Sequence, residues 1–249
     1  MHSTLLEICC YNLQSVKNAN AFGADRIELC SDMHSGGVTP SAGFIKAALA
    51  VSEIPVYVMI RPRGGDFLYS VGEIEIMMHD ISFAKKTGAG GVVFGLLHAD
   101  GSIDTEQTKR LVEAAYPLPS TFHRAIDMSN DLLNSAELLK ATGIQNILTS
   151  GGKQKAIDGI ETIAKMIEVA GKEISVMAGS GVSAENIPQL FKSGIRNFHA
   201  SASISGPGNM IFTNKDVKMN AAGDSNEFEI TIAHPDKIAA MRQVINTLY

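Results

Sequence analysis

Short apolar runs rich in β-branched residues recur along the whole chain, and each is followed by a stretch with apolar residues every three or four positions. The first pattern is typical of buried strands and the second of amphipathic helices. We therefore predict eight strands that alternate with helices. The predicted strands span residues 5–10, 24–30, 55–63, 91–97, 120–127, 145–150, 174–179 and 196–201.

Glycines mark four joints at which a predicted helix leads into a strand. Gly23, Gly88, Gly143 and Gly194 stand where a helix end favours a left-handed residue. Alternation of strands and helices implies right-handed crossovers and a parallel sheet. Eight repeats in 249 residues predict an α/β protein with one TIM-type (β/α)8 barrel domain over residues 1–249.

An open doubly wound sheet could use the same strands, but such sheets usually carry Gly-x-Gly-x-x-Gly after the first strand. The sequence lacks that motif there, and polar residues end nearly every predicted strand instead of gathering at one crevice. No linker or low-complexity stretch divides the chain. Residues 205–227, which are polar and rich in Gly and Asn, are predicted to form a loop excursion before a last helix that His234 and Pro235 open.

Charge and composition narrow the partners and the compartment. The chain has 21 Lys and Arg against 26 Asp and Glu, a net charge of -5, and no basic run longer than two residues, which argues against nucleic-acid binding. No apolar stretch approaches the ~20 residues of a bilayer-spanning helix, and the first residues lack the features of a signal peptide. We expect a cytoplasmic protein with no membrane partner. Its 3 cysteines are too few for a disulfide framework and are expected to be reduced thiols.

The first two predicted strands end with the same Glu-x-Cys spacing. Glu7 and Cys9 share one face of the first strand, and Glu28 and Cys30 share one face of the second. Their apolar neighbours belong under the helices, so these four side chains are predicted to point into the barrel. Cys10 has the opposite parity and is predicted to be a core residue.

Four further side chains with inward parity near strand ends complete the predicted barrel mouth, where barrels carry their chemistry. They are Arg61, His123, Asp127 and His199. Glu7 or Glu28 is a candidate general base, His123 or His199 a candidate general acid, and Asp127 a further carboxylate. Arg61 could hold an anionic substrate through two hydrogen bonds. The structural alternative is that these buried ions simply neutralise one another.

A glycine turn after the seventh strand is a candidate phosphate site. Gly179, Ser180 and Gly181 offer backbone N–H groups ahead of a helix that we expect to begin at Ser183. Ser150, after the sixth strand, is expected beside this turn. Ser201, on the inward face of the eighth strand, completes the candidate anion-binding set together with Arg61. A tight strand-to-helix turn explains the same glycines without a ligand.

Metal binding is a rival use of the same mouth. Adjacent strands lie about 4.8 Å apart, so Cys9 and Cys30 could reach one ion, and soft thiolates select Cu(I). The nearby Glu7 and Glu28 are expected to raise the pKa of both thiols and to disfavour the thiolate form. From the residues alone, packed cysteines without a metal remain the alternative.

Six segments in register resemble the CutC family of copper homeostasis proteins. They read GADRIELC at 23–30, GGVTPS at 36–41, MIRPRGGDF at 59–67, TFHRA at 121–125, LTSG at 148–151 and FHASA at 198–202. The resemblance implies a (β/α) barrel and cytosolic copper handling. It also implies that Cys9 and Cys30 match the cysteines proposed as Cu(I) ligands in that family.

Two functions therefore stay open. One is a copper homeostasis protein of CutC type that binds Cu(I) through thiols at the barrel mouth, with no organic cofactor. The other is a barrel enzyme that uses general acid–base chemistry on a small anionic or phosphorylated metabolite. The expected partners are a copper ion or a small anionic ligand, and a homodimer is a further expectation.

Overall fold

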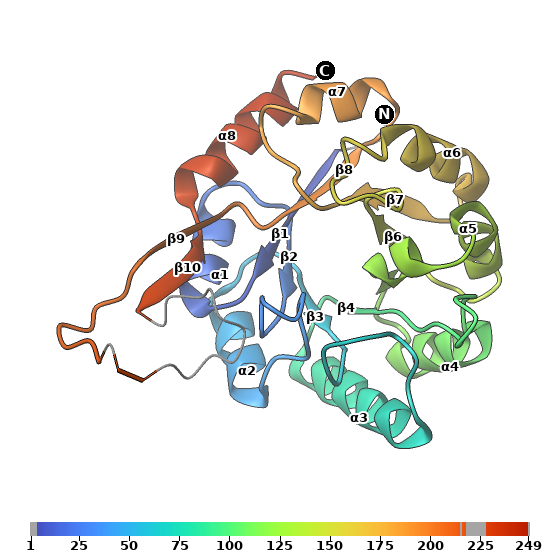
Figure 1. Ribbon diagram of the computed structural model, residues 1–249, viewed down its shortest axis with the longest axis horizontal. Helices are drawn as coiled ribbons and strands as arrows, with labels where there is room; N and C mark the ends of the chain where they lie inside the picture. Colours follow the sequence, from blue (N-terminus) through green and yellow to red (C-terminus); the bar gives the residue numbers. More distant parts are fainter. Residues whose placement is uncertain (1–3, 215, 218–227, 249) are drawn as a thin grey trace.

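Parallel strands close into a barrel in chain order, β1 to β8, in the computed structural model, which describes residues 4–214, 216–217 and 228–248 (Figure 1). Each strand pairs with its neighbours in the sequence, and β8 pairs back onto β1. This confirms the predicted TIM-type barrel and excludes the open sheet. The strands are β1 Leu5–Cys10, β2 Arg26–Leu29, β3 Val56–Met59, β4 Gly91–Phe94, β5 Ser120–Phe122, β6 Asn146–Thr149, β7 Ser175–Ala178 and β8 Asn197–Ala200.

Helices cover the outside of the barrel as a ring (Figure 1). Side-chain caps begin several of them, and at α3 Ser70 and Glu73 form a reciprocal capping box. The four predicted joint glycines all have positive φ, from 82 to 98°, which confirms their role. The helices are α1 Leu13–Ala21, α2 Ala42–Val51, α3 Val71–Thr87, α4 Thr105–Ala115, α5 Leu132–Lys140, α6 Ile160–Ala170, α7 Ile187–Lys192 and α8 Pro235–Asn246.

The two faces of the strands pack in separate clusters, as the alternation predicts. Leu6, Ile8 and Cys10 on the outer face of β1 belong to the large core beneath the helices. Cys9 and Cys30 belong to a small cluster inside the barrel. The predicted inward direction of these two thiols, and the outward direction of Cys10, are confirmed.

The predicted strand over residues 120–127 was wrong beyond Phe122. Residues Arg124–Met128 form a 3-10 helix, η1, instead of extended chain. His123 is the reason, because its Nδ1 accepts a hydrogen bond from the backbone N–H of Ala125 at 3.1 Å and so caps η1. Helix α7 also begins later than predicted, at Ile187 with Asn186 as its cap, and not at Ser183.

A two-stranded antiparallel ribbon stands beside the barrel, formed by β9 Ser203–Pro207 and β10 Glu229–Ala233. In Figure 1 the chain after β9 projects away from the barrel as an arm. The predicted excursion at 205–227 includes residues 215 and 218–227, which lie outside the described residues. Within the part of the chain that the structure describes, no helix is long and apolar enough to cross a membrane.

Candidate functional site

A cavity of about 1010 Å³ opens at the carboxyl ends of the strands. Six of the predicted charged and thiol side chains line it: Cys9, Glu28, Arg61, His123, Asp127 and His199. Glu7 and Cys30 do not line it and are fully buried next to residues that do. We call the group of Cys9, Glu28, Cys30 and His199 the thiol end of the cavity, and the group of Arg61, Phe67 and His123 its arginine end.

Strand register builds the thiol end. Glu7 is paired with Arg26 of β2 on one side and with His199 of β8 on the other, and Cys9 is paired with Glu28. The Arg26 Nε donates to Glu7 Oε2 at 2.5 Å, and His199 Nδ1 lies 2.8 Å from Glu7 Oε1. Both carboxylate oxygens of Glu7 are thus occupied. The predicted general base acts in this structure as the anchor of two cations.

The two inward thiols lie beside each other and beside a carboxyl group. Cys9 Sγ is 3.8 Å from Cys30 Sγ, and Cys30 Sγ is 3.5 Å from Glu28 Oε2. His199 Nε2 lies 3.7 Å from the same Glu28 oxygen. Two groups of possible metal ligands overlap here, Cys9 with Glu28 and Cys30, and Glu7 with Glu28 and His199.

Protonation at the thiol end follows from burial and neighbouring charge. Burial alone would raise the pKa of Glu7, but the Arg26 charge and the His199 hydrogen bond outweigh it and hold that pKa below its usual value. Burial would lower the pKa of His199, yet Glu28, Cys9 and Glu7 raise it well above its usual value. Burial, with the nearby Cys9, raises the pKa of Glu28.

The two thiols differ in acidity. The hydrogen bond between the two thiols lowers the pKa of Cys9 well below its usual value, with His199 acting in the same direction. Burial raises the pKa of Cys30, and Cys9 and Glu28 add to that shift. The expectation that neighbouring glutamates raise both pKa values was therefore wrong for Cys9, because the sequence does not reveal that the Cys30 thiol and the His199 imidazolium lie next to it.

The arginine end is built around Arg61, which follows β3. Its Nη1 donates to the carbonyl oxygens of Ser35 and Gly37, at 2.5 and 2.9 Å, and its Nη2 donates to that of Gly65 at 2.8 Å. The guanidinium therefore joins the β2–α2 loop to the β3–α3 loop. Its Cζ also lies 4.9 Å from the ring centre of Phe67.

His123 stands across the same aromatic ring. Its imidazole centre is 5.1 Å from that of Phe67, and only 4% of the residue is exposed. Gly95 leaves room for it, since a Cβ there would lie 2.5 Å from His123 Nδ1. Burial, with the Arg61 charge, lowers the pKa of His123 to about 3, so the ring is neutral at physiological pH.

Asp127 lines the cavity from η1, but its oxygens are already occupied. Oδ1 accepts hydrogen bonds from the Thr149 hydroxyl and the Gly152 N–H, at 2.5 and 3.1 Å. Oδ2 accepts from Arg124 Nε at 2.8 Å and from the Ser150 hydroxyl at 2.9 Å. Asp127 thus organises the loop after β6, and Ser150 does not line the cavity.

The candidate phosphate turn lies at the cavity rim without a helix start behind it. Ser180 and Gly181 line the cavity with Ser201, whereas Gly179 does not. The Gly179 N–H is engaged in the sheet, where it donates to the Thr149 carbonyl at 2.9 Å. A helix N-terminus was part of the phosphate prediction, and α7 begins six residues beyond Gly181.

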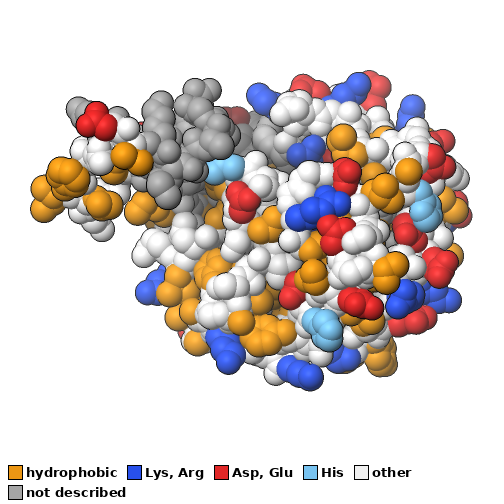
Figure 2. Space-filling model, turned by 60° about the horizontal axis from the view of Figure 1, so that its bottom comes forward, with side chains coloured by type: hydrophobic (Ala, Val, Ile, Leu, Met, Phe, Trp, Pro, Cys, Tyr) orange, Lys and Arg blue, Asp and Glu red, His pale blue; other side chains and the backbone are white. Residues whose placement is uncertain are grey.

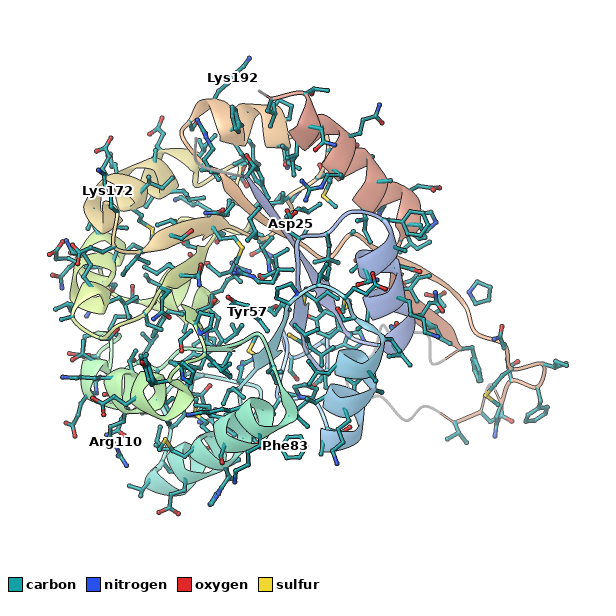
Figure 3. All side chains as sticks on the ribbon, turned by 180° about the vertical axis from the view of Figure 1, so that it is seen from behind. Asp25, Tyr57, Phe83, Arg110, Lys172 and Lys192 are labelled. Carbon is teal, nitrogen blue, oxygen red and sulfur yellow. The ribbon has the colours of Figure 1, made fainter. Side chains whose placement is uncertain are left out.

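The sequence reasoning missed Arg26 and Tyr11. Arg26 shares parity with Glu28, so alternation along β2 could have placed it in the barrel, where its guanidinium also stacks 4.1 Å from the Tyr57 ring centre. Figure 3 shows Tyr57 inside the ring of strands, while Lys172 and Lys192 lie on the outer ring. Tyr11 lines the cavity next to Cys9, and it follows β1 where strand parity no longer applies.

Comparisons with known proteins identify the family of this chain. The sequence profile of the CutC family matches residues 4–204. The chain belongs to the CutC family. It is 42% identical over 245 residues to the copper homeostasis protein cutC homolog of Homo sapiens, covering 98% of this chain and 90% of the human one.

Solved structures with the same fold superimpose on this chain. The putative copper homeostasis protein CutC from Streptococcus agalactiae superimposes with a TM-score of 0.75 at 36% identity, covering 80% of this chain and 98% of that one. Thiamine phosphate pyrophosphorylase from Pyrococcus furiosus gives a TM-score of 0.58 at 16% identity, covering 98% and 96%. The second similarity shows the barrel fold alone.

Proposed function

We propose that this CutC-family protein binds Cu(I) at the thiol end of its cavity, through Cys9 and Cys30. The observation that carries the proposal is the separation of 3.8 Å between the two sulfur atoms. A metal–sulfur bond of about 2.3 Å, the zinc–thiolate value, allows two sulfur ligands of one ion to lie up to about 4.6 Å apart. Soft thiolates favour Cu(I) over harder divalent ions.

The groups around the thiols support a site that exchanges protons for metal. Cys9 has a lowered pKa and supplies a thiolate, whereas Cys30 shares its S–H with Glu28 and must lose that proton when a metal binds. The imidazolium of His199 offsets negative charge beside the thiolate. A role in copper homeostasis in the cytoplasm fits three cysteines that are all free.

An anaerobic competition titration with a Cu(I) chelator tests the proposal. Wild-type protein and the Cys10→Ser variant should bind one copper ion per chain with equal affinity, because Cys10 packs outside the barrel. The Cys9→Ser/Cys30→Ser double variant should not compete with the chelator. Equal copper affinity in the double variant and wild type would remove these thiols as ligands.

Catalysis on a small anionic metabolite is the second candidate function. It is favoured by Glu28, which lines the cavity with a raised pKa and an Oε1 that has no hydrogen-bond partner among the described residues. Such a carboxyl group can act as a general acid or base near neutral pH. Protein in D₂O should then exchange deuterium into the methyl group of pyruvate, and Glu28→Gln should abolish the exchange. Exchange at the uncatalysed rate would argue against this use of Glu28.

Anion binding by Ser150, Gly179, Ser180, Gly181 and Ser201 stays a prediction.

A second copy of the chain is the partner that we propose for assembly. The arm after β9 carries three consecutive exposed apolar side chains, Met210, Ile211 and Phe212, with exposed fractions of 68%, 102% and 75%. Figure 2 shows hydrophobic side chains gathered on the projecting arm. Contiguous apolar surface of this kind is typical of protein–protein contacts. Analytical ultracentrifugation should show a dimer.

A further inference from the structure

Arg61 is a buried cation without a carboxylate partner. Only 5% of the residue is exposed. Within the described part of the chain no Asp or Glu lies within ion-pair distance of it. Arg124, the other cavity-lining arginine, is paired with Asp127. A buried charge that has only neutral partners favours the arrival of an anion.

The hydrogen bonds of Arg61 use three of its five N–H donors, and one of the remaining two, on Nε, is buried. Its Nη atoms donate to three backbone carbonyl oxygens, which hold the guanidinium plane in place. Its Nε is buried and makes no well-aligned hydrogen bond with any described residue, although the Tyr69 hydroxyl lies beside the guanidinium. Guanidinium donors commonly act in pairs toward planar anions. The free N–H on Nε can therefore bind one oxygen of such an anion, and a second donor is needed for the other oxygen.

His123 supplies a second unused donor. Its Nδ1 accepts from the Ala125 N–H, and a neutral imidazole then carries its proton on Nε2. That Nε2 is buried, and no described residue accepts a hydrogen bond from it. The low pKa of the ring keeps it uncharged across the physiological range, and the hydrogen bond from Ala125 holds its proton on Nε2.

One aromatic ring lies beside both donor residues. Phe67 contacts both the guanidinium of Arg61 and the imidazole of His123, and all three residues line the cavity. The lining of the cavity includes the apolar Leu68, Leu97 and Met128 as well as the polar Asp66 and His98. Both donor atoms are shielded from water, so neighbouring side chains have to shift before a ligand can reach them.

We propose that the arginine end binds the carboxylate of a small organic acid with an apolar body, one oxygen accepting from Arg61 Nε and the other from His123 Nε2. A planar carboxylate has two acceptor oxygens that match two N–H donors, and its charge neutralises Arg61. The apolar walls suit the rest of such a molecule. This site is separate from the thiols and does not rest on copper binding.

Isothermal titration and ¹⁵N NMR on the metal-free, full-length protein test the proposal. The probes are benzoate and propionate, their neutral isosteres benzamide and propionamide, and inorganic phosphate. At millimolar concentrations the two carboxylates should bind and shift the His123 Nε2 resonance. The amides and phosphate should bind at least about tenfold more weakly, because each lacks either the charge or the planar pair of oxygens.

Variants connect the binding to the two donors. Arg61→Lys keeps the positive charge but loses the paired N–H donors of the planar guanidinium. His123→Asn keeps an acceptor for the Ala125 N–H but loses the Nε2 donor. Each variant should weaken benzoate binding at least about tenfold. Arg124→Lys, at a paired arginine of the same cavity, should bind benzoate like wild type. The Cys9→Ser/Cys30→Ser variant should do the same, which separates this site from the copper proposal.

Several outcomes would overturn the proposal, and the wild-type measurements do not depend on any variant folding. They are no carboxylate binding at millimolar concentration, benzamide binding as tightly as benzoate, phosphate binding more tightly than either carboxylate, and an unmoved His123 resonance. Unchanged benzoate affinity in a folded Arg61→Lys protein would also overturn it.

Discussion

At the thiol end of the cavity the charged side chains form ion pairs with one another, whereas at the arginine end the cation is held by neutral carbonyl groups. Glu7 accepts from both Arg26 and His199, and His199 also lies near Glu28. Arg61 has three backbone partners, and its neighbour His123 is an uncharged donor. The same barrel mouth thus holds a neutralised network suited to a soft cation beside a positive region suited to an anion.

This difference shows that the two explanations considered from the sequence apply to different parts of the site. Mutual neutralisation accounts for Glu7, Arg26 and Asp127, each of which forms an ion pair. It does not account for Arg61 or for the Oε1 of Glu28, which finds no hydrogen-bond partner in the described part of the chain. Ligand chemistry is therefore expected at the groups that the network leaves incomplete.

Removing the anchor of the thiol end should have the largest effect. Glu7→Gln leaves the buried Arg26 and His199 without their shared counter-charge, so the free energy of unfolding should fall by about 3–5 kcal/mol. Urea denaturation measures it. Glu137→Gln, which breaks the surface pair with Lys140, is the control and should cost no more than about 1 kcal/mol. Equal losses in the two variants would show that the buried network is not stabilising.

Copper affinity should depend on pH through Cys30. Burial and the neighbouring Cys9 raise its pKa, so below that pKa metal binding must displace one proton, and the affinity should increase by up to about tenfold per pH unit. Cys9 has a lowered pKa and should not contribute above it. Chelator competition at several pH values measures the slope. Cys30→Ser should bind copper weakly and with no such slope, and a pH-independent wild type would contradict the assignment.

Cys10→Ser should affect stability and not the metal site. The Cys10 thiol is fully buried in the outer core, 3.6 Å from the Ile8 carbonyl, so a hydroxyl there should cost about 1 kcal/mol or somewhat more. Thermal unfolding measures this change. Lost copper affinity in this variant would contradict the prediction, from strand alternation, that Cys10 lies outside the barrel and takes no part in copper binding.

Charging the arm should have the smallest effect on the fold. Ile211→Asp with Phe212→Asp should change the unfolding free energy of the monomer by less than about 0.5 kcal/mol and should convert the dimer to monomer. Sedimentation velocity measures the assembly. Val71→Asp, at an apolar residue of α3 that is 80% exposed, serves as the control and should leave the dimer intact.

Local patterns were sufficient for the barrel and for much of the mouth. Alternation along β1 and β2 predicted that Cys9 and Cys30 point inward and that Cys10 does not, because strand parity is a property of consecutive residues. Parity failed where the strand itself ended early, after Phe122. There a hydrogen bond from the Ala125 N–H to the His123 side chain redirected the chain into η1, and Asp127 came to hold the loop after β6.

The sequence by itself determined the (β/α) repeat, the inward set of polar side chains and the pair of thiols, since each follows from spacing along one strand or one helix. Only the tertiary structure decided which charged side chains lie next to each other. Glu7 and His199 are 192 residues apart and become neighbours through closure of β8 onto β1. Burial and contacts between distant segments then set the opposite acidities of Cys9 and Cys30, the neutral state of His123 and the unpaired charge of Arg61, because pKa values and desolvation depend on surroundings that no local pattern contains.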